Sequence, residues 1–269
     1  MEENRRSFLK KAGCAAAGLG CGFPLLGAGC GALSEASADG EASGKQWGMV
    51  VDVRKCLQRE VREACTEACH KAHNVPQIHD PKEEVKWIWP EEYEHVFPDQ
   101  AHAHTESALS GQPVLVLCNH CTDPSCVRVC PTKATWKRES DGVVMMDMHR
   151  CIGCRYCIAA CPYGARSFNW KDPRDHVPKD PGGNWLSDFP TRAKGVVEKC
   201  NFCAERMPFS DDRKPACVEA ANSAEGGEGA LTFGDLSDPK SEIRRILSEN
   251  HTIARRISLG TGPNVFYIV

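Results

Sequence analysis

Two runs of cysteines, at residues 118–131 and 151–162, decide the fold of this sequence. The first is Cys118-x2-Cys121-x4-Cys126-x3-Cys130-Pro131, and the second is Cys151-x2-Cys154-x2-Cys157-x3-Cys161-Pro162. In such a run, three cysteines in a tight loop bind one 4Fe–4S cube, and the fourth, on the following helical turn, points toward a second cube. The proline after it has no N–H to leave unpaired, and it turns the polypeptide away. Each run therefore predicts ligands for two clusters.

Exchanging the fourth cysteines between the runs gives two complete ligand sets. The first set is Cys118, Cys121, Cys126 and Cys161, and the second is Cys151, Cys154, Cys157 and Cys130. Zinc sites take two pairs of ligands rather than three plus one, and a disulfide framework has no reason to end both runs in Cys-Pro. Between the runs, Asp141-Gly142 predicts a turn, and residues 143–146 the returning strand of a hairpin. The repeat of about 33 residues is the pattern of a two-cluster bacterial ferredoxin.

A second, incomplete pair of runs flanks the first. Its cysteines are Cys56, Cys65 and Cys69 upstream and Cys200, Cys203 and Cys217 downstream. The upstream run lacks its second cysteine, and the downstream run has Ala221-Asn222 where Cys-Pro is expected. Under the same exchange rule, Cys69 completes a third cluster with Cys200, Cys203 and Cys217. The fourth site would retain only Cys56 and Cys65.

The sequence thus predicts three 4Fe–4S clusters and an empty fourth site. Cys56 and Cys65 are interpreted as buried or disulfide-bonded thiols, and the alternative is a fourth cluster completed by a His or Asp ligand. Residues 65–70 have three residues between their cysteines, whereas a haem attachment motif has two. The histidines at 95, 102 and 104 form no HExxH pair and are expected at the surface.

Residues 1–38 predict a twin-arginine export signal. Arg5-Arg6 precedes a weakly apolar stretch rich in Gly and Ala, and Ala36-Ser37-Ala38 is a suitable cleavage site. Acylation at Cys30 is the weaker alternative, because Gly27 stands where such a signal has leucine. This pathway carries folded proteins, so we expect the clusters to be inserted before export to the periplasm. Cys14 and Cys21 would leave with the signal.

Composition excludes several classes of protein. The chain has 269 residues and 17 cysteines, with 33 basic and 36 acidic residues, so no basic field favours nucleic acid. A mean hydropathy of −0.41 and 41% hydrophobic residues exclude a polytopic membrane protein. After the signal no apolar run of about 20 residues follows, so we expect membrane association only through partners. Aromatic residues make up only 7%, which suggests that clusters rather than apolar packing organise the interior.

Basic residues near the cysteines are candidates to offset the negative charge of the clusters. They are Arg128, Arg150, Arg155, Arg166, Lys199 and Arg206. A solvated basic face is an equally good interpretation of any one of them. We hypothesise that Arg155 or Arg166 raises the reduction potential of a nearby cluster.

Residues 48–269 resemble the periplasmic ferredoxin subunits of polysulfide, tetrathionate and nitrite reductases. The motifs that carry this resemblance are residues 47–52, 118–121, 151–157, 161–166, 199–203 and 233–239. Within this group, residues 68–76, 86–90 and 93–95 are most similar to the DsrO subunits of DsrMKJOP complexes. The losses at Cys56 and Ala221 depart from the usual four clusters.

The resemblance implies an electron relay between a quinone-reactive membrane subunit of the NrfD or DsrP type and a multihaem cytochrome c (DsrJ-like), in sulfur or sulfite respiration. One alternative is the electron-transfer subunit of a molybdopterin polysulfide or tetrathionate reductase. Another is an autonomous reductase acting at Cys56 and Cys65. Because a carrier needs no substrate pocket, we expect no catalytic residues.

The expected fold is α+β, with two ferredoxin-like modules of which one is inserted in the other. Residues 110–172 form the inner module, and residues 39–109 and 173–235 contain the halves of the outer module with its connections. Residues 236–269 are expected to be a helix and tail, because Ile243, Ile246, Leu247, Ile253 and Ile257 follow helical spacing. This helix is interpreted as a packing element, with docking to a partner as the alternative.

Overall fold

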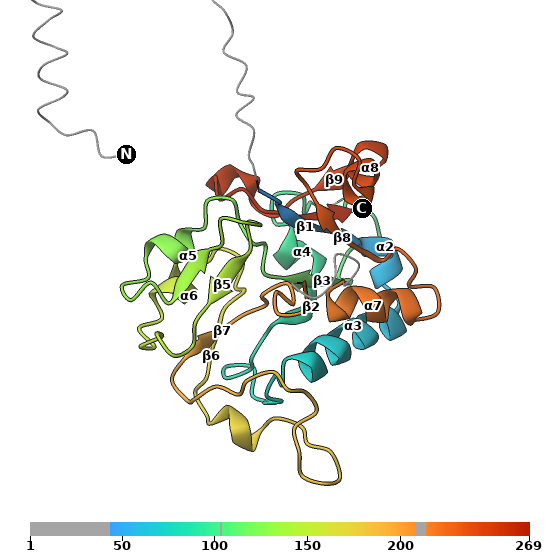
Figure 1. Ribbon diagram of the computed structural model, residues 1–269. Coiled ribbons are helices and arrows are strands. Elements are labelled where there is room, and N and C mark those ends of the chain that lie inside the picture. The colour runs from blue at the N-terminus through green and yellow to red at the C-terminus, as the bar shows by residue number, and fades with distance from the viewer. Residues whose placement is uncertain (1–43, 103, 208–213) are drawn as a thin grey trace, which may run out of the picture. The chain divides into compact units, whose positions relative to one another are not determined.

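A four-stranded sheet joins segments from near the two ends of the described residues (Figure 1). Strand β1 (Trp47–Asp52) lies between β8 (Leu231–Asp235), which is antiparallel to it, and β10 (Val265–Ile268), which is parallel. The short strand β9 (Thr252–Ile253) pairs with the outer edge of β10. Consecutive residues of β1 are buried on both faces, as expected for a strand covered on both sides.

This computed structural model describes residues 44–102, 104–207 and 214–269. The predicted export signal, with Cys14, Cys21 and Cys30, lies outside the described residues. The described residues fall within one unit. Among their helices, none has the length and apolar character needed to cross a bilayer.

Two helices pack against each other beside the sheet. Helix α3 (Arg59–Ala72) buries Val61, Cys65 and Cys69, which recur every four residues on one face. Helix α7 (Ala216–Ser223) buries small side chains, including Cys217 and Ala221, and therefore approaches α3 closely. The short helix α2 (Val53–Cys56) leads from β1 to α3, and its first turn is capped by the carboxylate of Asp52.

The cysteine-rich centre of the sequence forms a smaller arrangement of the same kind. The short helices α5 (Ser125–Arg128) and α6 (Tyr156–Ala159) contact each other. Strand β4 (Thr135–Lys137) pairs antiparallel with β5 (Val144–Met146), so the predicted hairpin is confirmed. Strand β6 (Ser167–Phe168) pairs instead with β7 (Val197–Glu198), which lies beyond the second cysteine run.

The connections contribute an apolar core larger than the aromatic content suggested. Strand β2 (Ile88–Glu92) pairs antiparallel with β3 (Pro113–Leu117), and helix α4 (Tyr93–Val96) and a 3-10 turn, η1 (Pro173–Asp175), complete these segments. Trp87, Ile88, Leu115 and Leu117 are almost completely buried there. Apolar packing therefore contributes to the interior together with the cysteines, several of which belong to the same core.

The C-terminal segment differs from the predicted helix and tail. Helix α8 covers only Glu242–Glu249, and it is followed by β9, a 3-10 turn (η3, Ile257–Leu259) and β10. The polar residues Asn250 and His251 end the helical pattern, and Ile253 belongs to a strand. The isoleucine spacing was misleading because it spans three elements, α8, β9 and η3. Ile243 packs against the sheet, whereas Ile257 is exposed.

A buried ion pair fixes β7 to the end of α3. Arg192 and Glu198 are both completely buried and pair directly. Glu198 also accepts hydrogen bonds from Trp87 Nε1 at 2.7 Å and Asn169 Nδ2 at 2.6 Å. Arg192 Nη1 donates to the carbonyl oxygens of His73 and Asn74 at 2.7 and 2.9 Å. Both members of the buried pair are thus also hydrogen-bonded to residues from other segments of the fold.

We expect Arg192→Met to lower the free energy of unfolding by about 3–5 kcal/mol, because Glu198 would remain as a buried, unpaired charge. Urea unfolding followed by circular dichroism under anaerobic conditions measures this. The control is Arg59→Met, which removes an exposed pair with Glu63 and should change the free energy by less than about 0.5 kcal/mol. Equal effects of the two variants would contradict the importance of the buried pair.

Candidate iron–sulfur centres

The four thiols of the first predicted ligand set line one cavity. Cys118, Cys121, Cys126 and Cys161 surround it, together with Tyr163 and Arg166. Cys118 follows β3, Cys126 lies on α5 and Cys161 follows α6, so the elements predicted to supply the ligands converge here. Four cysteine sulfurs facing one enclosed space are the donor set that a 4Fe–4S cluster needs. The residues present therefore fit this cofactor.

A buried cation beside this cavity can stabilise negative charge on the cysteine sulfurs. Arg166 is buried, and its Nη2 donates to Cys126 Sγ at 3.0 Å. Burial opposes the charge of Arg166, but the sulfurs of Cys126 and Cys157 outweigh it and raise its pKa. Burial raises the pKa of Cys121 to about 12, so this thiol needs a metal or a cation to ionise.

The third predicted set is the most deeply buried. Cys69 on α3, Cys200, Cys203 and Cys217 on α7 are all buried. Burial raises the pKa of Cys69, and the neighbouring sulfurs of Cys200, Cys217 and Cys203 raise it further, so the four sulfurs lie near one another. The backbone N–H groups of Phe202 and Ala216 donate to Cys200 Sγ at 3.4 Å and Cys203 Sγ at 3.3 Å. These thiols also fit a cluster.

The second predicted set lies nearer the surface. Cys151 and Cys157 interact electrostatically, and Val197 N–H donates to Cys151 Sγ at 3.4 Å. Cys130, Cys151 and Cys154 are only partly buried. Despite partial burial, N–H groups of Thr135, Ala134 and Thr132 and the Thr132 hydroxyl hold the pKa of Cys130 below its usual value. The interactions of Cys130 are thus with its own loop, and those of Cys157 extend to Cys151 and Cys126.

Cys56 and Cys65 are buried, free thiols, so the structure contains no disulfide between them. Their sulfurs lie against carbonyl oxygens, with Cys56 Sγ 3.8 Å from Ala230 O and Cys65 Sγ 3.4 Å from Cys217 O. A thiol can donate to a carbonyl, whereas a thiolate cannot. Burial raises the pKa of Cys65 to about 12. The surroundings thus favour the protonated form of both residues.

The six candidate cations occupy different environments. Arg166 and Lys199 are buried, and Lys199 Nζ donates to Cys200 O at 2.6 Å. Arg206 is paired with Glu219 at 2.6 Å. The three others are exposed: Arg128 pairs with Asp123, Arg150 pairs with Asp147, and Arg155 lies over the Phe168 and Trp170 rings. Of the two residues in our hypothesis, only Arg166 contacts a predicted ligand.

Two buried histidines were not recognised as site residues from the sequence. His73 Nδ1 lies 3.0 Å from Cys69 O, and its Nε2 is 2.8 Å from Glu205. Donor atoms of His73, Cys203 and Glu205 all lie within 4.8 Å of one another. His120 is completely buried beside Cys121. The available signal was that His120 directly precedes Cys121 and that His73 follows Cys69 by four residues. His95, His102 and His104 are exposed as predicted.

Comparison with known proteins supports the presence of 4Fe–4S clusters in a protein of this kind. Residues 114–175 match the family described as 4Fe-4S dicluster domain, so the predicted two-cluster ferredoxin-like domain is confirmed. The sequence is 41% identical over 238 residues to the Hdr-like menaquinol oxidoreductase iron-sulfur subunit 1 of Archaeoglobus fulgidus, with 83% of each protein covered.

Two further relatives are components of sulfur-compound reductases. A component of the polysulfide reductase of Wolinella succinogenes is 34% identical over 232 residues, which cover 83% of this chain and 94% of the relative. A component of the tetrathionate reductase of Salmonella typhimurium is 30% identical over 272 residues, which cover 100% of this chain and 89% of the relative.

We expect Arg166→Gln to lower the reduction potential of a cluster by roughly 60–120 mV, because a cation bound to Cys126 favours the more negative, reduced form. Redox titration followed by electron paramagnetic resonance (EPR) measures the shift. Arg155→Gln is the control, since that guanidinium is exposed and should shift the potential by less than about 20 mV. Equal shifts in the two variants would show that burial next to sulfur is not the cause.

Proposed function

This protein belongs to the family of iron–sulfur electron-transfer subunits of quinone-linked oxidoreductase complexes, and we propose that it relays single electrons through three 4Fe–4S clusters. The observation that carries this proposal is the cavity enclosed by the thiols of Cys118, Cys121, Cys126 and Cys161. Each cluster, when bound, supplies one reversible single-electron change. The protein's own residues hold the sulfurs, exclude water and offset charge.

The proposed ligands fall into three sets. They are Cys118, Cys121, Cys126 and Cys161; Cys151, Cys154, Cys157 and Cys130; and Cys69, Cys200, Cys203 and Cys217. Backbone N–H groups donate to the sulfurs of Cys151, Cys200 and Cys203, and the Arg166 guanidinium donates to Cys126, so these sulfurs have the hydrogen-bond donors that a bound cluster needs. The carbonyl contacts of Cys56 and Cys65 favour thiol instead.

The missing fourth set is accompanied by close packing. Val61, Val218 and Ala221 are almost completely buried between α3 and α7. A Cβ atom on Gly227 would lie 2.2 Å from Ala221 O, so the loop after α7 closes directly over that end of the helix. We therefore retain the assignment of three clusters rather than four.

Two ferredoxin-like modules account for this arrangement. The pairing of β1 with β8 and of α3 with α7 joins segments far apart in the sequence, and α5 with α6 forms a second pair between them in sequence. We propose that residues 110–172 are an inner module inserted between the halves of an outer one. The domain limits 39–109, 173–235 and 236–269 follow from that proposal.

The proposed setting is the periplasmic face of a membrane complex. The predicted twin-arginine signal would export the folded protein, and partners would bring it to the membrane. We propose a NrfD or DsrP type membrane subunit on one side and a multihaem cytochrome c on the other, as for DsrO subunits in sulfite respiration. The name of the menaquinol oxidoreductase relative supports the quinone side.

The second candidate is a subunit of a molybdopterin reductase for polysulfide or tetrathionate. The polysulfide and tetrathionate reductase relatives favour it, because each aligns with more than four-fifths of this sequence. Purification from membranes in mild detergent distinguishes the two. We expect a quinone-reactive membrane subunit with a multihaem cytochrome c; a molybdopterin subunit in their place would support the second candidate.

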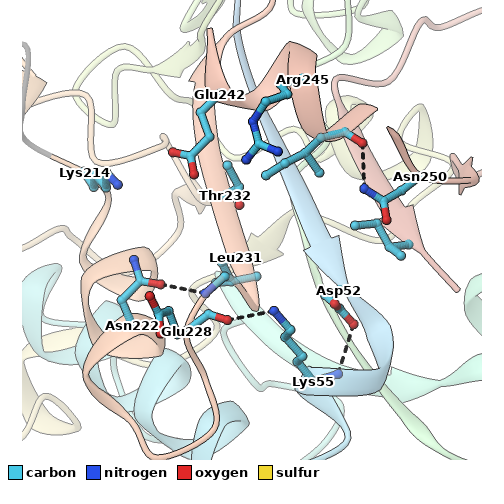
Figure 2. A pocket seen from close by; sticks show the side chains of 13 residues that line it. Asp52, Lys55, Lys214, Asn222, Glu228, Leu231, Thr232, Glu242, Arg245 and Asn250 are labelled. Carbon is cyan, nitrogen blue, oxygen red and sulfur yellow. Dashed lines mark hydrogen bonds between the residues drawn. The ribbon is translucent and has the colours of Figure 1, made fainter. Parts of the chain in front are cut away.

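An autonomous reductase acting at Cys56 and Cys65 is disfavoured, because both thiols are completely buried. A hollow of about 690 Å³ lies between α2, α7, β8 and α8, and Figure 2 shows its lining. Charges of both signs line it, such as Lys55, Glu228 and Arg245, and none of its lining residues is a cysteine. Lys55 Nζ is bound to Glu228 O at 2.8 Å. A substrate bound there would not contact a proposed ligand.

We expect about 12 iron atoms per protein molecule, and we expect Cys69→Ala to reduce this to about 8. The matched control is Cys65→Ala, one turn away on the buried face of α3, which should leave the iron content unchanged. Iron and acid-labile sulfide analysis of anaerobically purified protein measures both. A wild-type value near 16, or iron loss in Cys65→Ala, would contradict the three-cluster assignment.

A further inference from the structure

Two aromatic rings from distant loops are stacked in the interior. The rings of His120 and Phe202 have centroids 3.7 Å apart and planes inclined by 18°. Both residues are buried, with 0% and 1% of their surface exposed. Each occupies the third position of a Cys-x-x-Cys loop, in Cys118-Asn119-His120-Cys121 and Cys200-Asn201-Phe202-Cys203. The stack therefore joins two of the proposed ligand loops face to face.

The backbone at this position is left-handed in the three Cys-x-x-Cys loops that begin at Cys118, Cys151 and Cys200. The φ angles are 42° at His120, 56° at Phe202 and 70° at Gly153, which is the third residue of the Cys151 loop. A side chain in this region costs about 1–2 kcal/mol, and glycine avoids the cost. Two loops nevertheless carry a ring where the third has glycine. Strain of this kind is typical of residues retained for function.

Neighbouring groups fix both rings. Val144 N–H donates to His120 Nδ1 at 3.1 Å, and Asn264 Nδ2 donates to His120 O at 2.7 Å. Phe233 packs edge-on against Phe202 with centroids 5.3 Å apart. The buried ammonium of Lys199 binds the carbonyl of Cys200 beside the stack. The pair is thus a rigid contact between the two loops rather than a chance approach of mobile side chains.

The stack joins the loop of Cys118 and Cys121 to the loop of Cys200 and Cys203, so it lies between the first and third proposed ligand sets. The first set also meets the second, because helix α5, which carries Cys126, contacts helix α6, which carries Cys157. The cavity of Cys118, Cys121, Cys126 and Cys161 is therefore central, with one proposed site on either side.

We propose that the His120–Phe202 stack is the electron-transfer junction between the outer and inner modules. This inference rests on the proposed function. One electron leaves the site of Cys69, Cys200, Cys203 and Cys217 and arrives at the site of Cys118, Cys121, Cys126 and Cys161, or moves in reverse; no bond forms and no proton is transferred. The site of Cys151, Cys154, Cys157 and Cys130 exchanges electrons with the outer site only through the central one.

The physical reason is electronic coupling. Tunnelling rates fall steeply with the length of the gap between bonded paths, and two rings in van der Waals contact leave a short gap. His120 is bonded to Cys121 through one peptide unit, and Phe202 to Cys203 in the same way. His120 and Phe202 are thus positioning residues for electron transfer, since the ring contact holds two ligand loops at a fixed separation.

The test compares Phe202→Leu with Phe97→Leu in the cluster-containing protein. Both variants remove one buried ring, but Phe202 is stacked on His120, whereas Phe97 packs against Tyr93 and Tyr267. A single electron is injected by pulse radiolysis, and its redistribution among the clusters is followed by transient absorption. We expect Phe202→Leu to slow redistribution by roughly tenfold and Phe97→Leu to change it by less than about twofold. Unchanged redistribution in Phe202→Leu with all clusters present would overturn the proposal.

A second measurement on the wild-type protein removes dependence on the variants. In the fully reduced protein, pulsed EPR should give a stronger magnetic coupling of the cluster at Cys69, Cys200, Cys203 and Cys217 to the central cluster than to the cluster at Cys151, Cys154, Cys157 and Cys130. Equal coupling to both, or stronger coupling to the cluster at Cys151, would overturn the junction. Iron analysis separates this outcome from failure of the proposed function, because absence of iron would refute the relay itself, whereas intact clusters with the wrong coupling refute only the junction.

Discussion

Burying a sulfur that must carry negative charge requires compensation nearby, and much of this structure follows from that constraint. Burial, together with the neighbouring sulfurs of Cys118, Cys126 and Cys161, raises the pKa of Cys121 to about 12, so the surroundings of this thiol disfavour its ionisation without a metal. Arg166 and Lys199 are buried beside the proposed sites, whereas Arg128, Arg150 and Arg155 remain at the surface. Backbone N–H groups point at Cys151, Cys200 and Cys203. The sulfurs of Cys56 and Cys65 lie beside carbonyl oxygens instead. These two cysteines, which the sequence spacing leaves outside the three predicted ligand sets, thus also differ from the others in their hydrogen-bond partners.

Cysteine spacing predicted the most because the geometry of a metal cube is rigid and leaves few alternatives. It predicted the approach of Cys69 to Cys200, Cys203 and Cys217, although more than 130 residues separate Cys69 from Cys200. The hairpin at Asp141-Gly142 followed from local turn chemistry. The helix expected to continue to Ile257 failed because isoleucine suits both helices and strands, and periodicity across Asn250 could not separate them. The Arg192–Glu198 pair and the position of His120 depend on tertiary contacts, for which one sequence carries no local signal.

The helix pairs α5–α6 and α3–α7 both bring cysteines together, but they differ in length and in packing. In α5 and α6, one turn of helix is enough to present a cysteine beside the partner loop. In α3 and α7, the helices are longer and pack through apolar side chains at the end where Ala221 stands. Packing there supplies stability of the ordinary apolar kind, while the opposite end of the same pair holds Cys69 and Cys217.

The sheet that closes the fold has a consequence for the order in which the molecule is made. Strand β1 pairs only with β8 and β10 among the described strands, and Met49 lies opposite Phe233 on one side and Val265 on the other. Contacts of such long sequence separation form late, because the intervening residues must be ordered first. The ribosome must therefore release almost the entire polypeptide before β1 finds its partners. The residues around Cys118 and Cys151 are close in the sequence, so the inner region can begin to fold during synthesis while β1 remains unpaired.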